Sequence, residues 1–137
     1  MKRYVLDTCA LIALLNEENG ASKVASLYES AVSGEAKLIM NIINLTELYY
    51  GYYREDGATF AEQQLEAICQ SAIEINEIID IKLLRIAGRL KATYRISLAD
   101  SFAVAQAILS GAVLVSSDHH ELDVVDIAGE VEFLWFR

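Results

Sequence analysis

The sequence predicts an α/β protein whose parallel sheet is covered by helices on both faces. Two observations support this fold class. Short β-prone runs alternate with longer segments of helical periodicity, and the β-prone runs are apolar almost throughout. Alternating strands and helices need crossover connections, which make neighbouring strands parallel. The chain has 137 residues and no linker-like segment, so we expect a single domain over residues 1–137.

Five runs are predicted to be strands because each is short, apolar and rich in β-branched or aromatic residues. In chain order they are Tyr4–Leu6, Leu38–Ile42, Ala72–Ile75, Val113–Ser116 and Glu132–Phe136. We expect the last run to close one edge of the sheet. Two polar, glycine-containing breaks, at residues 16–20 and 54–57, are predicted to be surface connections within the domain.

Apolar residues at helical spacing predict helices between the strands. Two buried faces are expected, one formed by Val24, Leu27, Tyr28 and Ala31, the other by Leu83, Leu84, Ala87, Leu90 and Tyr94. A third helix repeats alanine every fourth residue, at Ala99, Ala103 and Ala107, so it can pack closely against a neighbour.

Composition restricts the classes of function. With 11 basic and 20 acidic residues, the net charge of −9 argues against indiscriminate nucleic-acid binding, which depends on neutralising phosphates. Selective binding remains possible if positive charge is clustered. No apolar stretch approaches the roughly 20 residues that span a bilayer, so no membrane partner is expected. Cys9 and Cys69 lack a CxxC partner, and we expect both to be reduced, buried thiols of a cytoplasmic protein.

Four acidic residues lie at junctions with apolar runs, where a solvated carboxylate is unusual. They are Asp7, Glu47, Asp100 and Asp118. Ligands of open α/β sheets bind beyond the carboxyl ends of the strands, and Asp7 follows the first strand directly. If the fold gathers all four at that edge, they form a pocket of oxygen ligands. Mg²⁺ or Mn²⁺ suits such a pocket, and a water activated by the ion could hydrolyse a phosphodiester.

Each acid also has a purely structural interpretation. Asp7 could be the N-cap of the following helix, and Asn44 to Glu47 is close to a capping box with Asn44 as N-cap. Asp100 stands in the same relation to Ser97, and Asp118 could belong to an ordinary polar turn. Individually these alternatives compete well. Together, the four acids favour a metal site, because one sheet topology places all of them on one side.

Other polar residues are weaker candidates. Hydroxyls that could orient a bound water or the carboxylates belong to Thr8, Ser116 and Ser117, although each could serve an ordinary turn or cap. Asp123 is a weak candidate for a further acidic ligand. The basic side chains that could contact substrate phosphates are Arg85, Arg89 and Arg95, although a solvated helix face explains them equally well.

Four motifs occur in the order found in a known family: Val5-Leu6-Asp7-Thr8, Thr46-Glu47-Leu48, Ala99-Asp100-Ser101-Phe102-Ala103-Val104-Ala105 and Val115-Ser116-Ser117-Asp118. Each motif is weak alone, but the ordered set resembles a PIN domain, specifically the VapC-type toxin of type II toxin–antitoxin modules. The likeness covers almost the whole chain. It implies a three-layer α/β/α sandwich around a parallel sheet of about five strands.

The resemblance also implies an activity and partners. It implies a Mg²⁺- or Mn²⁺-dependent endoribonuclease that cleaves RNA, with Asp7, Glu47, Asp100 and Asp118 at the family's acidic positions. It further implies a homodimer held inactive by a cognate antitoxin. An alternative is a non-catalytic PIN-like module that acts through protein–protein contacts. A phosphoryl-accepting receiver fits poorly, because neither an acidic pair after the first strand nor a lysine after a late strand is evident. A DxD phosphatase fits poorly, because Asp7-Thr8-Cys9 lacks the second aspartate.

Overall fold

The computed structural model describes residues 1–137, which form five strands and seven helices. The strands are β1 (Lys2–Leu6), β2 (Ala36–Asn41), β3 (Ile73–Asn76), β4 (Val113–Ser116) and β5 (Phe133–Trp135). The helices are α1 (Thr8–Leu15), α2 (Ala21–Val32), α3 (Ile42–Asp56), α4 (Ala58–Cys69), α5 (Ile81–Thr93), α6 (Leu98–Ser110) and α7 (His119–Ile127). All five predicted strands are present, with ends shifted by one or two residues.

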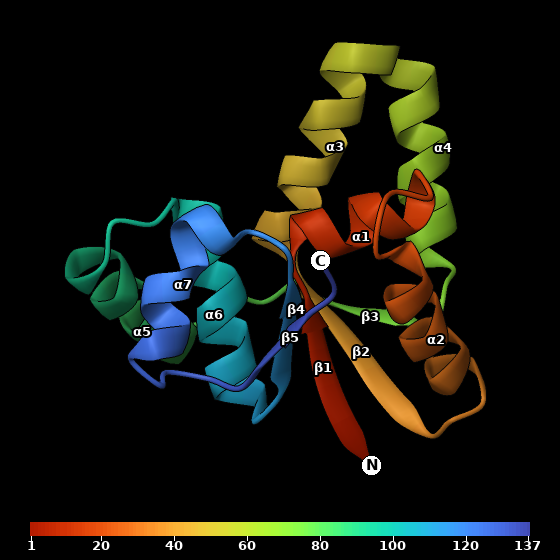
Figure 1. Ribbon diagram of the computed structural model, residues 1–137. Helices are drawn as coiled ribbons and strands as arrows, with labels where there is room; N and C mark the ends of the chain where they lie inside the picture. The colour runs from red at the N-terminus through yellow and green to blue at the C-terminus, as the bar shows by residue number, and fades with distance from the viewer.

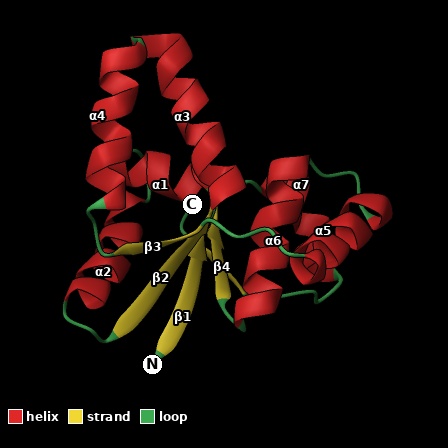
Figure 2. Cartoon of the chain, turned by 180° about the vertical axis from the view of Figure 1, so that it is seen from behind, coloured by secondary structure: helices red, strands yellow, loops and turns green.

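The sheet is parallel throughout, in the order β3-β2-β1-β4-β5. The chain builds outward from β1 to β3 on one side and then returns to add β4 and β5 on the other. This reversal beside β1 is a topological switch point, where the carboxyl ends of the strands leave room for a ligand. Those ends gather at one edge of the sheet (Figure 2), directly below the starts of α1 and α3.

Helices cover both faces of the sheet and form the two outer layers of a three-layer sandwich (Figure 1). Side chains that alternate along a strand point to opposite faces, and β1 shows this directly: Val5 packs in the core beneath α5 to α7, while Leu6 packs beneath α1 and α2. Helices α3 and α4 form a hairpin that rises beyond the edge of the sheet. The predicted α/β class and three-layer architecture are confirmed.

Two predictions about burial are wrong. Leu84 is 52% exposed, because the apolar stripe of α5 runs through Leu83, Ala87 and Leu90, and Leu84 lies beside that stripe. Cys69 is exposed at the end of α4, whereas Cys9 is partly buried as expected. Both cysteines are free thiols. None of the helices combines the length and apolar character that a membrane crossing needs.

The C-terminus is tied to the turn between α1 and α2. Gly20 has φ +86°, and a Cβ built at this position would collide with the carbonyl oxygen of Phe136, whose side chain is buried. Arg137 adds a hydrogen bond of 3.1 Å to the carbonyl of Asn19. The last residues of the chain are thereby held beside the loop that carries Ser117, close to the carboxyl edge of the sheet.

We expect Gly20→Ala to lower the free energy of unfolding by about 3 kcal/mol or more, because it combines left-handed strain with a backbone collision. Gly34→Ala is the matched control, since Gly34 has φ +82° and open space around its Cβ position. The control should lose only about 1 kcal/mol. Urea denaturation measures both, and equal losses would show that the contact with Phe136 is unimportant.

Candidate metal centre

Asp7 follows β1 directly and is the N-cap of α1. Its Oδ1 accepts a hydrogen bond of 2.8 Å from the amide of Ala10, which confirms the capping role. The residue is 1% exposed, and its Oδ2 is buried without any hydrogen-bond partner. Since buried polar atoms are almost always paired, this oxygen is unusual in being free to bind a cation.

Asp100 and Asp118 also lie at the starts of helices. Asp100 is in the first turn of α6, where its amide donates to the capping hydroxyl of Ser97 at 3.1 Å, and it is 8% exposed. Asp118 is the N-cap of α7 and accepts a bond of 3.3 Å from the amide of Glu121. The positive end of each helix dipole favours a carboxylate at these positions.

Glu47 reaches the site from α3, although not through the capping box that the sequence suggested. The helix begins at Ile42, and its N-cap is Asn41, whose Oδ1 accepts a 2.8 Å bond from the amide of Ile43. The prediction of Asn44 as N-cap is therefore wrong, because the chain turns into the helix directly after β2. Glu47 lies in the second turn of α3, half-buried.

The four predicted acids converge, and a fifth joins them. Carboxylate oxygens of Asp100, Asp118 and Glu121 lie within 4.8 Å of one another. Asp7 and Glu47 lie close enough for their charges to act on the same surroundings: Asp118 and Glu47 both raise the pKa of Asp7, and all four predicted acids act on the partly buried thiol of Cys9. Its pKa is raised to about 12 by burial and by the negative charges of Asp7, Asp118, Asp100 and Glu47. We call these five carboxylates the acidic cluster: Asp7, Glu47, Asp100, Asp118 and Glu121.

The pKa values of the two buried acids in this cluster are raised. Burial raises the pKa of Asp7 to about 7, although the Ser116 hydroxyl and the Ala10 amide act in the opposite direction. The charges of Asp118 and Glu47 add to the rise. Burial also raises the pKa of Asp100 well above its usual range, followed by its hydrogen bond with Glu121 and the charges of Asp7 and Asp118. The same hydrogen bond lowers the pKa of Glu121. Asp100 therefore holds the proton of this pair and donates a hydrogen bond to the Glu121 carboxylate.

Sequence reasoning missed Glu121 and weighed Asp123 in its place. Asp123 points away from the cluster and pairs with Nδ1 of His119 at 2.8 Å. A usable signal was present: Asp118 and Glu121 have the spacing of a capping box, with the acid at N3. An N-cap that is itself a candidate ligand brings its N3 partner within reach of the same ion.

The three predicted hydroxyls make contacts that hold the site loops. Thr8 Oγ1 donates to the carbonyl of Asn44 at 3.1 Å, and the buried Ser116 hydroxyl accepts a 3.0 Å bond from the amide of Asp118. Ser117 accepts a 3.2 Å bond from the guanidinium of Arg137. All three thus support the backbone around the acids.

The basic side chains differ in their availability. Arg89 forms two hydrogen bonds of 3.0 Å with the carboxylate of Glu130, which binds both ends of its guanidinium. Arg85 and Arg95 are exposed and form no ion pair with an acidic side chain. These two arginines are the free cations among the three predicted substrate contacts.

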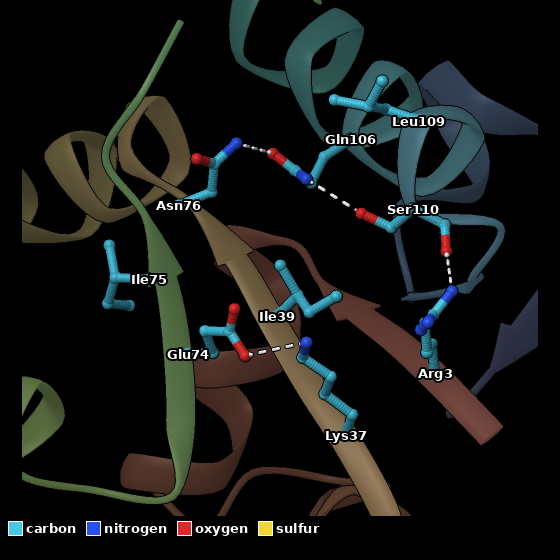
Figure 3. A pocket seen from close by; sticks show the side chains of 9 residues that line it. All are labelled: Arg3, Lys37, Ile39, Glu74, Ile75, Asn76, Gln106, Leu109 and Ser110. Atoms are coloured by element: carbon cyan, nitrogen blue, oxygen red, sulfur yellow. Dashed lines mark hydrogen bonds and ion pairs between the residues drawn. The ribbon is translucent and has the colours of Figure 1, made fainter. Parts of the chain in front are cut away.

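A polar cavity of about 250 Å³ lies elsewhere, against the amino-terminal half of the sheet beside α6 (Figure 3). Its polar groups satisfy one another: Lys37 pairs with Glu74 at 3.2 Å, and Arg3 donates to the carbonyl of Ser110 at 3.2 Å. Gln106 bonds with Asn76 and Ser110. No buried polar atom of this cavity is left free for a ligand, in contrast to Asp7 in the acidic cluster.

The acidic cluster fits a hard divalent cation. Its donors are oxygens only, they converge from four separate segments, and one buried oxygen has no partner within the protein. Hard ions such as Mg²⁺ and Mn²⁺ prefer carboxylate and water ligands of this kind. A cation would also stabilise the charged form of Asp7 and Asp100, whose pKa is raised first by burial and then by neighbouring negative charges.

Comparison with known proteins finds similarity in both sequence and structure. Residues 4–128 match the family profile described as PIN domain. The chain is similar in structure to VapBC2 of Rickettsia felis bound to a promoter DNA fragment (TM-score 0.74, 18% identity, covering 97% of this chain and 98% of that one). It is also similar to DNA-bound VapBC from Salmonella typhimurium (0.74, 17%, 100% of both chains). VapBC-1 from nontypeable Haemophilus influenzae is a third similar structure (0.73, 18%, 98% of both). No curated protein matches the sequence.

We expect the ion-free protein to become less stable as the pH rises from about 4 to above 7. The folded pKa of Asp7 is raised to about 7 and that of Asp100 is also raised, so the folded state keeps protons that the unfolded chain has released. The stabilisation is complete below the unfolded pKa near 4 and is lost as the pH passes through the folded values. The loss should be on the order of 3 kcal/mol.

Thermal melts with chelator across this pH range measure the effect. Added Mn²⁺ should reverse the trend and stabilise the protein more at high pH, because the ion competes with protons for the carboxylates. A melting temperature that rises from pH 4 to pH 8 in chelator would contradict the prediction.

Proposed function

Because the chain belongs to the PIN domain family, we propose that it is a Mg²⁺- or Mn²⁺-dependent endoribonuclease that acts as the toxin of a toxin–antitoxin pair. The observation that carries the proposal is the acidic cluster at the carboxyl edge of the sheet, with a buried Asp7 oxygen that has no partner. Neither a histidine nor a cysteine stands among these donors as a nucleophile.

The five carboxylates would hold the ion. When bound, the ion supplies Lewis-acid stabilisation of the phosphate and lowers the pKa of a water. The chain supplies the rest. The amide of Ala10 fixes one oxygen of Asp7 and leaves the other free to bind. Asp100 must release the proton that it shares with Glu121 before its oxygens become full ligands, which makes binding stronger as the pH rises.

RNA would reach the cluster along α5. The exposed cation Arg85 lies on the helix and Arg95 just after it, and both can neutralise phosphates of the substrate away from the bond that is cut. Arg89 contributes mainly through its bidentate pair with Glu130, which fastens α5 to the segment before β5. Substrate contact by Arg89 would require this pair to open.

The proposed antitoxin has a suitable surface. An apolar groove of about 310 Å³ lies between α1, α2 and α4, and its lining includes Leu11, Leu14, Leu15, Tyr28 and Ile68. An amphipathic helix can place its apolar face in such a groove. The three similar structures named above are VapBC assemblies, which supports a protein partner of this kind. The acidic cluster would also attract a basic side chain of that partner.

We also propose a homodimer. Exposed apolar side chains follow one another from the end of β3 into α5: Ile78 is 71% exposed, Ile81 60% and Leu84 52%. A contiguous apolar surface of this kind is typical of a protein–protein contact. The patch shares no residue with the apolar groove, so dimer and antitoxin would use different surfaces.

We expect Asp100→Asn and Glu121→Gln to lower metal-dependent RNA cleavage by at least about 100-fold while leaving the fold intact, because each removes a charged oxygen ligand. Asp123→Asn is the matched control, since Asp123 lies on the same helix as Glu121 but outside the cluster. Cleavage of total RNA by purified protein in Mn²⁺, with and without chelator, measures the three variants.

The control should cleave at the wild-type rate. Undiminished cleavage by Asp100→Asn would refute the site. Mn²⁺ binding by the wild type without cleavage of any RNA would instead support a non-catalytic PIN-like binding module.

We expect Arg85→Ala to raise the KM for RNA severalfold and to leave kcat nearly unchanged, because Arg85 would contact phosphate away from the reacting bond. The slope of log affinity against log salt should fall by about 0.7, the value for one lost contact with a single strand. Lys23→Ala is the control, since Lys23 is exposed on α2 across the sheet. Equal effects of the two variants would rule out a phosphate-binding surface on α5.

A further inference from the structure

Two buried amides join α3 to α6, the helices that carry Glu47 and Asp100. Asn44 Nδ2 donates to the carbonyl of Ala99 at 3.0 Å, and Asn41 Nδ2 donates to Oε1 of Gln106 at 2.9 Å. Asn41 and Asn44 are both 0% exposed. The contacts fall on the first turn of α6 and about two turns further on, so they fix the direction of the helix as well as its position.

The contact made by Asn44 lies close to acids of the cluster. Ala99 directly precedes Asp100, and Asn44 is three residues before Glu47, on neighbouring turns of α3. The backbone carbonyl of Asn44 also accepts the 3.1 Å bond from Thr8, the residue after Asp7. Asn44 therefore lies on the helix of Glu47 and is bonded to the segments that carry Asp7 and Asp100.

The side-chain amide of Asn44 has only part of its hydrogen-bonding capacity satisfied. Its Oδ1 is buried and has no hydrogen-bond partner, so the side chain satisfies its donor and leaves its acceptor free. Leaving a buried acceptor unpaired is unfavourable, so Asn44 contributes less to local stability than a fully paired amide would. The helical role that the sequence suggested for Asn44 is already filled by Asn41, whose own Oδ1 caps α3.

We propose that Asn44 and Asn41 are positioning residues whose amides clamp α3 to α6 and hold Glu47 and Asp100 in place for the cation. The inference rests on the proposed metal-dependent function and concerns its site. Like charges on two helices push the helices apart, and two fixed points between them oppose that movement. With the helices held, the carboxylates need little rearrangement when an ion binds.

Binding of Mn²⁺ to the full chain tests the clamp without an activity assay. Electron paramagnetic resonance measures the free Mn²⁺ at each protein concentration, and the titration gives the dissociation constant. For Asn44→Ala we expect a Kd about tenfold higher than that of the wild type with the same number of sites, the usual effect of losing a group that orients ligands.

Tyr52→Phe is the matched control. Tyr52 lies on α3 and donates a 2.9 Å bond to Asn16, so the variant loses one hydrogen bond of the same helix without a contact to α6. It should melt at a lower temperature than the wild type, as Asn44→Ala does, but bind Mn²⁺ within twofold of the wild type. A purely structural role for Asn44 predicts the same Kd for the two variants, and that result would overturn the inference.

A second variant tests the clamp if Asn44→Ala does not fold. Asn41→Ser keeps a good N-cap for α3 and removes only the donor to Gln106, so it should also raise the Kd severalfold. A folded Asn41→Ser with wild-type affinity would then overturn the clamp. A wild-type protein that binds no Mn²⁺ would refute the proposed function and this inference together, whereas wild-type binding with unchanged variants refutes the inference alone.

Discussion

The burial and crowding of carboxylates are the constraint around which the rest of this structure is arranged. Burial opposes the negative charge of Asp7 and Asp100, and two carboxylates about 4 Å apart also repel by roughly 4 kcal/mol at an effective dielectric near 20. A folded protein is stable by only about 5–15 kcal/mol, so this repulsion must be reduced. The chain reduces it by keeping protons on Asp7 and Asp100, at the expense of stability as the pH rises.

Helix ends supply a second means of accommodating the charge. Asp7, Asp100 and Asp118 all lie at helix starts, where backbone amides and the dipole favour an anion. Structural and functional interpretations of these acids are therefore not alternatives. A carboxylate at an N-terminus uses one oxygen for the cap and presents the other beyond the strand ends, as Asp7 does. The capping bond to Oδ1 therefore holds the side chain so that Oδ2 stays in position for a metal ion.

The sequence could predict the strands and the acids that follow them, because apolar runs and the polar residues that end them are local features. Asp7 and Asp118 follow β1 and β4, and the parallel order of the sheet brings those strands together. Glu121 was missed because its relation to Asp118 is a property of the helix start. Asn44 was misplaced because the end of β2 and the start of α3 share one residue, Asn41, and local pattern does not separate them. Its bond to Ala99 spans 55 residues and is invisible before folding.

Net charge also bears on how such a site could meet RNA. The chain carries −9, and one of the three arginines considered for substrate contact, Arg89, is already paired with Glu130. Few positive side chains therefore remain to draw a polyanion toward an acidic edge. A divalent cation held by the acidic cluster would lower the local negative potential exactly where a phosphate must approach. In the proposed function the ion would thus serve substrate binding as well as chemistry, and affinity for RNA would depend on whether the carboxylates hold a metal or protons.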